Sequence, residues 1–267
     1  NDYIETFREL NTHEIALIGL KHVNLKEESQ KLKVLSQSSN LTPETKIDES
    51  ILLDVPFAHL HNHSQYSILQ STTEVEDLVK KAAKLNMPAV ALTDLGNMMA
   101  AFDFVSAINK HNKGIADEKK KAEEAGEPFN KIPLKGVLGC EFFVCTNHKD
   151  KTQKDNGYQI ILVAKNKKGY HNLAKMSSIS YIDGFYYVPR IDREVILKYK
   201  EDLMVFSGGM YGEVSSKILN VGEKQAEEAL LWWKETFGND FYLQIMRHDQ
   251  EDENRVNQTL VSFSKKH

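Results

Sequence analysis

Three histidines occupy alternate positions in one short stretch of the chain. Residues 57–70 read FAHLHNHSQYSILQ, which places His59, His61 and His63 two residues apart. Successive side chains of a β-strand point to opposite faces, so three imidazoles at alternate positions would point the same way. Imidazole nitrogen is a common ligand of zinc and other divalent metals. The spacing is therefore typical of a metal site at the end of a strand, in which two neighbouring histidines share an ion.

Length and composition exclude several classes of protein. The chain has 267 residues, 41% of them hydrophobic, which suits one large domain or a domain with an appendage. It has no apolar run near the roughly 20 residues that span a bilayer and no signal-like start, so we expect a cytoplasmic protein. The formal net charge of -4 opposes strong nucleic-acid binding by this segment alone, because that binding depends on Lys and Arg. The absent initial Met and an end inside an apparent helix indicate an excerpt of a longer protein.

The two cysteines are expected to be reduced packing residues. Cys140 and Cys145 lie five positions apart in one expected strand, so their side chains should face opposite ways. A disulfide between them is therefore not expected.

The first 54 residues differ in pattern from the rest. Residues 15–23 are apolar enough for a short strand, and the charged, Ser/Thr-rich residues 25–50 indicate a helix that runs into a linker. We therefore expect a connector over residues 1–54 and a main domain over residues 55–267. Deleting residues 31–50 should leave most of the stability intact.

The main domain alternates apolar strand candidates with helical stretches, which favours parallel βα units. In one helix, residues 71–86, Thr73 and Glu76 form a possible capping box. The charge-dense residues 111–132 indicate a solvated helix or loop insertion. A further helix is expected over residues 224–237, and the expected strands are residues 89–94, 135–145, 158–166, 203–209 and 241–248.

Several blocks of the sequence resemble a known family. Residues 57–69, 87–104 and 136–144, together with AKNKKGYHNLAKMSS and DGFYYVPRID, look like the polymerase and histidinol phosphatase (PHP) domain of bacterial DNA polymerase III alpha subunits. The last two blocks, in this order, resemble the polymerase members rather than the small phosphatases. The resemblance covers about residues 56–267, and residues 7–29 resemble the connector of longer polymerases that carry an upstream exonuclease domain.

The resemblance implies an α/β fold, a distorted (β/α)7 TIM-like barrel with an N-terminal appendage. Sites in such barrels gather at the carboxyl ends of the strands. The segments HLHNH, LTD, GCE, SGG and MRH are all expected at such ends.

The family also implies a site of three metals and nine ligands. In this chain the retained positions match His61, His63 and Glu141. The last expected pair, Asp-x-His, would lie beyond His267. The remaining four expected ligands are replaced, by Gln70, Leu95, Gln159 and Gly209.

The replaced positions belong to two of the three implied metals. A divalent ion needs about four good donors, and leucine or glycine offers none from its side chain. One zinc or manganese ion could persist at the retained residues; alternatively, these residues are kept because they hydrogen-bond each other in a barrel mouth. His59, Asp94 and His248 are candidates for second-shell residues or substitute ligands.

Three hypotheses about function follow. The first is a non-catalytic PHP module that supports the downstream domains of a replicative polymerase and docks an exonuclease or another replisome subunit. The second is an active metal-dependent 3′–5′ proofreading exonuclease or phosphoesterase in the same polymerase. The third is a free-standing PHP-class phosphatase. Nucleotidyl transfer and its Mg²⁺ would belong to the parent polymerase, which would also make the DNA contacts, and no membrane partner is expected.

Overall fold

The computed structural model describes residues 56–248 and 250–267. The expected connector over residues 1–54, with its short strand and helix, lies outside these residues.

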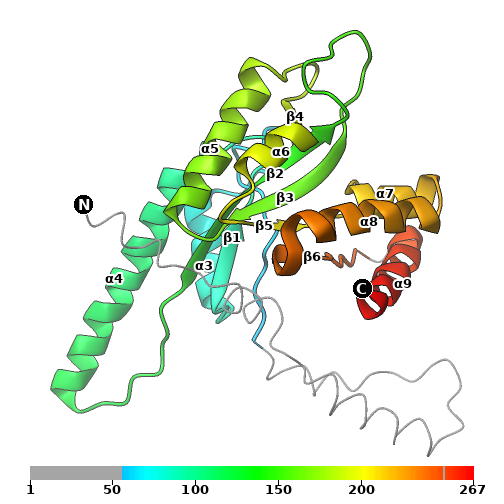
Figure 1. Cartoon of the computed structure of the whole chain (residues 1–267). Helices are drawn as coiled ribbons and strands as arrows, with labels where there is room; N and C mark the ends of the chain where they lie inside the picture. The colour runs from blue at the N-terminus through cyan, green and yellow to red at the C-terminus, as the bar shows by residue number, and fades with distance from the viewer. Residues whose placement is uncertain (1–55, 249) are drawn as a thin grey trace, which may run out of the picture.

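Six strands form one mixed sheet in the order β1-β2-β3-β5-β6, with β4 paired to β2 (Figure 1). The pairs β1–β2, β2–β4 and β5–β6 are parallel, whereas β3 runs antiparallel to both β2 and β5. The strands are β1 (Ala89–Leu92), β2 (Lys135–Cys145), β3 (Tyr158–Ala164), β4 (Arg190–Asp192), β5 (Leu203–Phe206) and β6 (Phe241–Tyr242).

The expectation of uniformly parallel βα units is wrong for β3. Residues 146–157 connect β2 to β3 without a helix. Parallel neighbours need a long crossover, whereas antiparallel strands can be joined directly, so the chain returns beside β2 in the opposite direction. The expected strand at residues 241–248 is also shorter, because β6 ends at Tyr242.

Helices cover the outer face of this sheet (Figure 1). The helices expected over residues 71–86 and 224–237 are present, and the charge-dense stretch at residues 111–132 lies mostly in α4. The helices are α3 (Val75–Lys84), α4 (Ala101–Ala125), α5 (Lys167–Ile182), α6 (Arg193–Tyr199), α7 (Glu213–Asn220), α8 (Glu223–Phe237) and α9 (Glu251–Lys266).

The prediction of a capping box at the start of α3 is wrong. The N-cap is Glu74, whose side chain makes no capping hydrogen bond. A capping box places its acidic residue at the third helical position. Because the helix begins at Val75, Glu76 is at the second position and the pairing with Thr73 does not form.

Strand alternation divides the apolar residues between two layers. On the outer face, Phe142 and Leu162 belong to the large core between sheet and helices, which also contains the buried Trp233 of α8. On the inner face, Ile161, Met204 and Phe206 form a smaller core. Cys140 and Cys145 are both buried and free, as expected.

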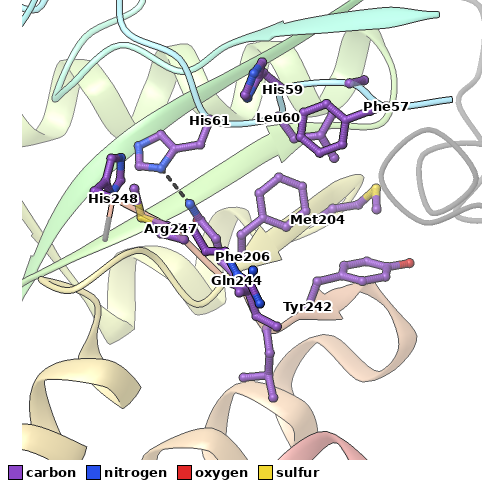
Figure 2. Close-up of a pocket in the computed structure, with 14 residues that line it drawn as sticks. Phe57, His59, Leu60, His61, Met204, Phe206, Tyr242, Gln244, Arg247 and His248 are labelled. Carbon is purple, nitrogen blue, oxygen red and sulfur yellow. Dashed lines mark hydrogen bonds between the residues drawn. The ribbon is translucent and has the colours of Figure 1, made fainter. Parts of the chain in front are cut away.

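The sheet is not closed into a barrel within the described residues. Residues 58–63 lie along the edge of β1 that does not pair with β2. There Ala91 N–H donates to His59 O (3.0 Å) and Thr93 N–H donates to Asn62 O (2.9 Å). This segment is not a regular strand, so the expected strand through the histidines is wrong. Between it and β6 lies a cavity of about 580 Å³, lined by Leu60, Phe206 and Tyr242 among others (Figure 2).

No helix in the part of the chain that the structure describes is long and apolar enough to cross a membrane.

Candidate metal centre

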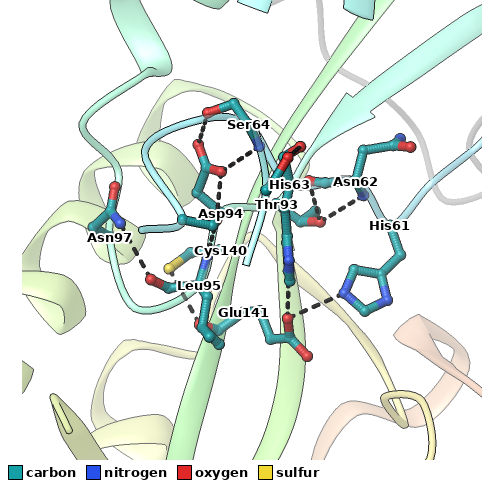
Figure 3. Close-up of polar contacts among 12 residues, drawn as sticks. His61, Asn62, His63, Ser64, Thr93, Asp94, Leu95, Asn97, Cys140 and Glu141 are labelled. Atoms are coloured by element: carbon teal, nitrogen blue, oxygen red, sulfur yellow. Dashed lines mark hydrogen bonds and ion pairs between the residues drawn. The ribbon is translucent and has the colours of Figure 1, made fainter. Parts of the chain in front are cut away.

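His61, His63 and Glu141 meet on the inner side of the sheet. The Nε2 atoms of His61 and His63 lie 3.1 Å and 2.6 Å from the same carboxylate oxygen, Oε2 of Glu141 (Figure 3). The side chain of Glu141 is 3% exposed, and those of His61 and His63 are 15% and 22% exposed. The carboxylate is thus buried, and the two imidazoles lie between it and solvent.

Glu141 lies inside β2 rather than at its end, which corrects the expected position of the GCE segment. On one edge of β2, residues 135–138 pair with β1 and residues 143–145 pair with β4. Between these two pairings, the loop after β1 supplies a bridge from Leu95 to Glu141, and Gly96 N–H donates to Glu141 O (2.7 Å). Glu141 therefore lies at the point on β2 where the pairing with β1 has ended and the pairing with β4 has not yet begun.

Asn62 holds the histidine segment against β1. Its side-chain amide donates to His59 O and to Ala91 O, both at 3.0 Å. Its backbone N–H donates to Thr93 Oγ1 (3.1 Å), and that hydroxyl donates to Asn62 O (3.1 Å). These bonds replace a regular ladder and fix the backbone on both sides of the His61 side chain.

The two histidines favour the ionised form of Glu141. Burial raises the pKa of a carboxyl group, but here the hydrogen bonds of His61 and His63 oppose burial and the pKa of Glu141 is lowered to about 2. A carboxylate is therefore available at neutral pH.

The donor set fits one divalent ion. One ligand atom from each of His61, His63 and Glu141 lies within 4.8 Å of the other two, and no other such group of three or more occurs among residues 56–248 and 250–267. Two imidazoles and one carboxylate are a known protein ligand set for zinc, in which a water or substrate takes the fourth position. A bound ion would polarise that water or an oxygen of a substrate.

Asp94 and His248 are already engaged in other contacts. Asp94 accepts hydrogen bonds from Ser64 N–H, Ser64 Oγ and Ser67 Oγ, at 2.6 to 2.7 Å (Figure 3). His248 Nδ1 lies 2.6 Å from Glu253 Oε1 in α9. The carboxylate of Asp94 is thus engaged with two serines, whereas the contact of His248 uses only Nδ1. Neither residue belongs to the group of clustered ligand atoms.

His59 is not part of the group of clustered ligand atoms, although it lines the same cavity as His61. It is exposed, and its ring packs edge-on against Phe57 with centroids 4.8 Å apart. The three alternate histidines therefore do not share one site, because the segment is not a regular strand.

Two of the replaced positions lie near Glu141. Leu95 is its bridge partner, and Gln159 shares its face of the sheet because Gln159 pairs with Phe143, two residues along β2. Neither leucine nor a glutamine amide is a strong ligand for a divalent transition metal.

The other two replaced positions offer no donor to the group. Gln70 is exposed in the turn after His63. A Cβ built on Gly209 would lie 2.3 Å from Met246 Sδ, so a thioether side chain occupies the space of the expected cysteine.

Sequence reasoning missed Gln244, which contacts the ligand group directly. Its Nε2 lies 2.9 Å from His61 Nδ1, on the opposite side of the ring from Glu141. Gln244 lies beyond the end of β6, in the stretch expected to be strand, and its residue type alone gave no signal.

Comparisons with known proteins agree with this architecture. Residues 59–248 match the model of the PHP domain. The DNA polymerase III subunit alpha of Borreliella burgdorferi is 40% identical over 213 residues, which are 78% of this chain and 17% of that protein. Those of Chlamydia muridarum and Aquifex aeolicus are each 33% identical, over 73% and 79% of this chain and 14% and 17% of their own lengths. The chain thus spans less than a fifth of the length of these relatives.

Proposed function

The chain belongs to the PHP domain family, and from this premise we propose that it is a structural and partner-docking PHP module of a replicative DNA polymerase. The observation that carries the proposal is the donor set. His61, His63 and Glu141 offer ligands for one ion. Leu95 and Gln159 lie near this group without equivalent donors, and Gly209 has no side chain to offer one.

The loss of catalysis follows from the number of ions. Two-metal hydrolysis of a phosphoester places one ion by the attacking oxygen and one by the leaving oxygen. The described residues supply three clustered donors, which suffice for one zinc with a water in the fourth position. A second ion would need donors that these positions do not offer, so we infer that the module does not hydrolyse primer ends.

A closed barrel is part of this proposal. β6 is the last strand of the sheet, and residues 58–63 lie at the other end, across the cavity that Figure 2 shows. The cavity lining is largely apolar, as the gap left by a missing strand would be. We infer that a further strand of the whole protein fills this gap and brings the Asp-x-His pair that the family implies, next to His61.

The whole protein would supply the polymerase activity. The relatives are named as alpha subunits of DNA polymerase III, and this chain spans 17% or less of each of the three described above. We infer that nucleotidyl transfer with Mg²⁺, and the contacts with DNA, belong to other domains of that protein. An exonuclease or another replisome subunit is the proposed docking partner.

Elemental analysis of the purified chain tests the proposal. After incubation with Zn²⁺ or Mn²⁺ and desalting, we expect at most about one ion per chain, because one site retains donors. The double variant His61→Ala with His63→Ala should hold none, whereas His111→Ala with His171→Ala, on α4 and α5, should match the unmodified chain. Two or three ions per chain would contradict the degenerate site.

A further inference from the structure

Gln244 connects β5 and the metal-ligand candidates. Its backbone N–H donates to Ser207 Oγ (2.9 Å), which fixes the residue beside the end of β5. Its side chain then reaches across the cavity, and Nε2 lies 2.9 Å from Nδ1 of His61 (Figure 2). Glu141 contacts the other nitrogen of the same ring at 3.1 Å. His61 is thus held between an amide and a carboxylate.

These two contacts define where the proton of a neutral His61 lies. A neutral imidazole carries a proton on one nitrogen and a lone pair on the other. If the amide N–H of Gln244 donates to Nδ1, the ring proton is on Nε2 and donates to Glu141. This arrangement satisfies both neighbours, but it leaves no lone pair on Nε2, the atom that faces the other donors.

A metal ion needs the opposite tautomer. With the lone pair on Nε2, the proton must lie on Nδ1 and requires an acceptor on that side. Gln244 carries such an acceptor. Its Oε1 is one of two buried side-chain polar atoms without a hydrogen-bond partner among the described residues. Rotating the amide by half a turn exchanges Nε2 and Oε1, which differ little in size.

We propose that Gln244 is a positioning residue for the metal site and that its amide turns over when an ion binds. In the metal-free chain the amide N–H donates to Nδ1 and stabilises the pair of His61 with Glu141. In the metal-bound chain Oε1 accepts from Nδ1–H and directs the Nε2 lone pair at the ion. The inference rests on the proposed function only in that the site must be able to hold one ion.

Imidazole ¹H–¹⁵N NMR and a Zn²⁺ titration against a competing chelator test the proposal on the 267-residue chain. In the unmodified chain, the ring proton of His61 should be on Nε2 without metal and on Nδ1 with Zn²⁺. The variant Gln244→Glu offers only acceptors, so the proton should be on Nδ1 even without metal. The variant Gln244→Met, of similar length, should bind Zn²⁺ about 10- to 100-fold more weakly, the usual effect of losing a partner of a ligand.

A surface substitution of the same type, Gln225→Met in α8, is the control and should leave Zn²⁺ affinity unchanged. The tautomer is the decisive readout, because the added charge of Gln244→Glu raises affinity for a cation by itself. Affinity of Gln244→Met equal to that of the unmodified chain would overturn the proposal. So would a His61 proton that stays on Nε2 after Zn²⁺ saturation, or the absence of Zn²⁺ binding in the unmodified chain. The last result would leave the proposed non-catalytic function standing.

Discussion

At the scale of single residues, Glu141 explains why the group of three is stable with or without an ion. A buried carboxylate needs hydrogen-bond donors, and the two imidazoles supply them. The same three side chains are also suitable metal ligands. Their presence in the sequence therefore does not by itself distinguish a working metal site from a hydrogen-bonded remnant.

Asn62 is expected to control the position of His61. Replacing Asn62 with Ala removes two hydrogen bonds to backbone carbonyls. We expect a loss of about 1–3 kcal/mol in the free energy of unfolding. Urea unfolding should report this loss, and the ring resonances of His61 and His63 should move.

Asn112→Ala is the matched control. Asn112 also makes two side-chain hydrogen bonds to backbone, both to Leu134. It should lose similar stability without moving the ring resonances of the two histidines. Unchanged resonances in Asn62→Ala would show that Asn62 does not position the site.

Gly209 is expected to accept a side chain when Met246 is shortened. Gly209 is not among the residues with positive φ, so its backbone conformation does not exclude a side chain. The obstacle is Met246 Sδ, 2.3 Å from a built Cβ. Gly209→Cys should therefore destabilise the chain by about 1–3 kcal/mol through overpacking. A double-mutant cycle should show that Met246→Ala removes most of this added cost.

Gly208→Cys provides the comparison for that cycle. Gly208 has φ +80°, and its built Cβ would lie 2.2 Å from the backbone oxygen of Gln159. Met246→Ala should give no relief here. Equal relief at both glycines would contradict a local contact between Gly209 and Met246.

At the scale of elements, the sequence located strands better than it oriented them. The bounds of β2 agree with the expected residues 135–145, because a continuous apolar run with flanking polar residues is a strong signal. The same run contains no information on whether its neighbours are parallel. β3 is antiparallel to β2 because the connection between them contains no helix. The loop at Leu95 contacts β2 because β1 and β4 share one edge of that strand and leave Glu141 between them.

β4 and α6 were not predicted from the sequence. β4 has only three residues, Arg190–Asp192, two of them charged. Arg190 is fully buried, and its guanidinium donates to the carbonyls of four residues in neighbouring loops, Gly184, Asp155, His148 and Asp150. Three of these four partners lie 35 to 42 residues from Arg190 in the sequence, so residue types alone do not predict them.

The junction of α6, α7 and α8 is expected to depend on pH through Glu213. This buried carboxylate accepts hydrogen bonds from Arg193, Lys217 and Trp233. Burial raises the pKa of Glu213, but its cationic and hydrogen-bonding neighbours outweigh burial and lower the pKa from 4.5. A lowered folded-state pKa stabilises the fold above the unfolded pKa, and the contribution is lost as pH falls through the folded pKa.

Glu213→Gln should therefore be less stable than the unmodified chain at pH 7, by about 2 kcal/mol. The difference should shrink as pH falls below about 4.5, near the pKa of an unperturbed glutamate. Chemical unfolding at pH 7, 5 and 3 measures it, with Glu124→Gln on the exposed side of α4 as the control for charge change. A constant difference across this range would contradict the assigned role of Glu213.

At the scale of the whole molecule, the family resemblance predicted the α/β class. It also predicted that candidate site residues from separate segments of the chain would lie together. It also implied a closed barrel, whereas the described sheet runs from β1 to β6 without closing. A closed sheet has no free edges. The cavity beside Gln244 marks where closure would have to occur.

Restoring donors at the replaced positions is expected to raise the metal content of the chain. Leu95→His and Gln159→His place imidazoles next to Glu141, on its bridge partner and on its face of the sheet. The combined variant should bind more Zn²⁺ per chain than the unmodified protein, measured by elemental analysis. Gln70→Asp, in an exposed turn, should add little by itself. Unchanged metal content in the combined variant, with the fold intact by circular dichroism, would count against these positions.

We propose that this PHP module is not a nuclease, and hydrolysis of a primer end is the direct test. A 3′-labelled primer is incubated with the purified chain and Mn²⁺ or Zn²⁺, beside the variant His61→Ala with His63→Ala. We predict no release of the 3′ nucleotide above the level of that double variant, because one ion cannot support two-metal hydrolysis. Hydrolysis by the unmodified chain that disappears in a folded double variant would contradict this proposal.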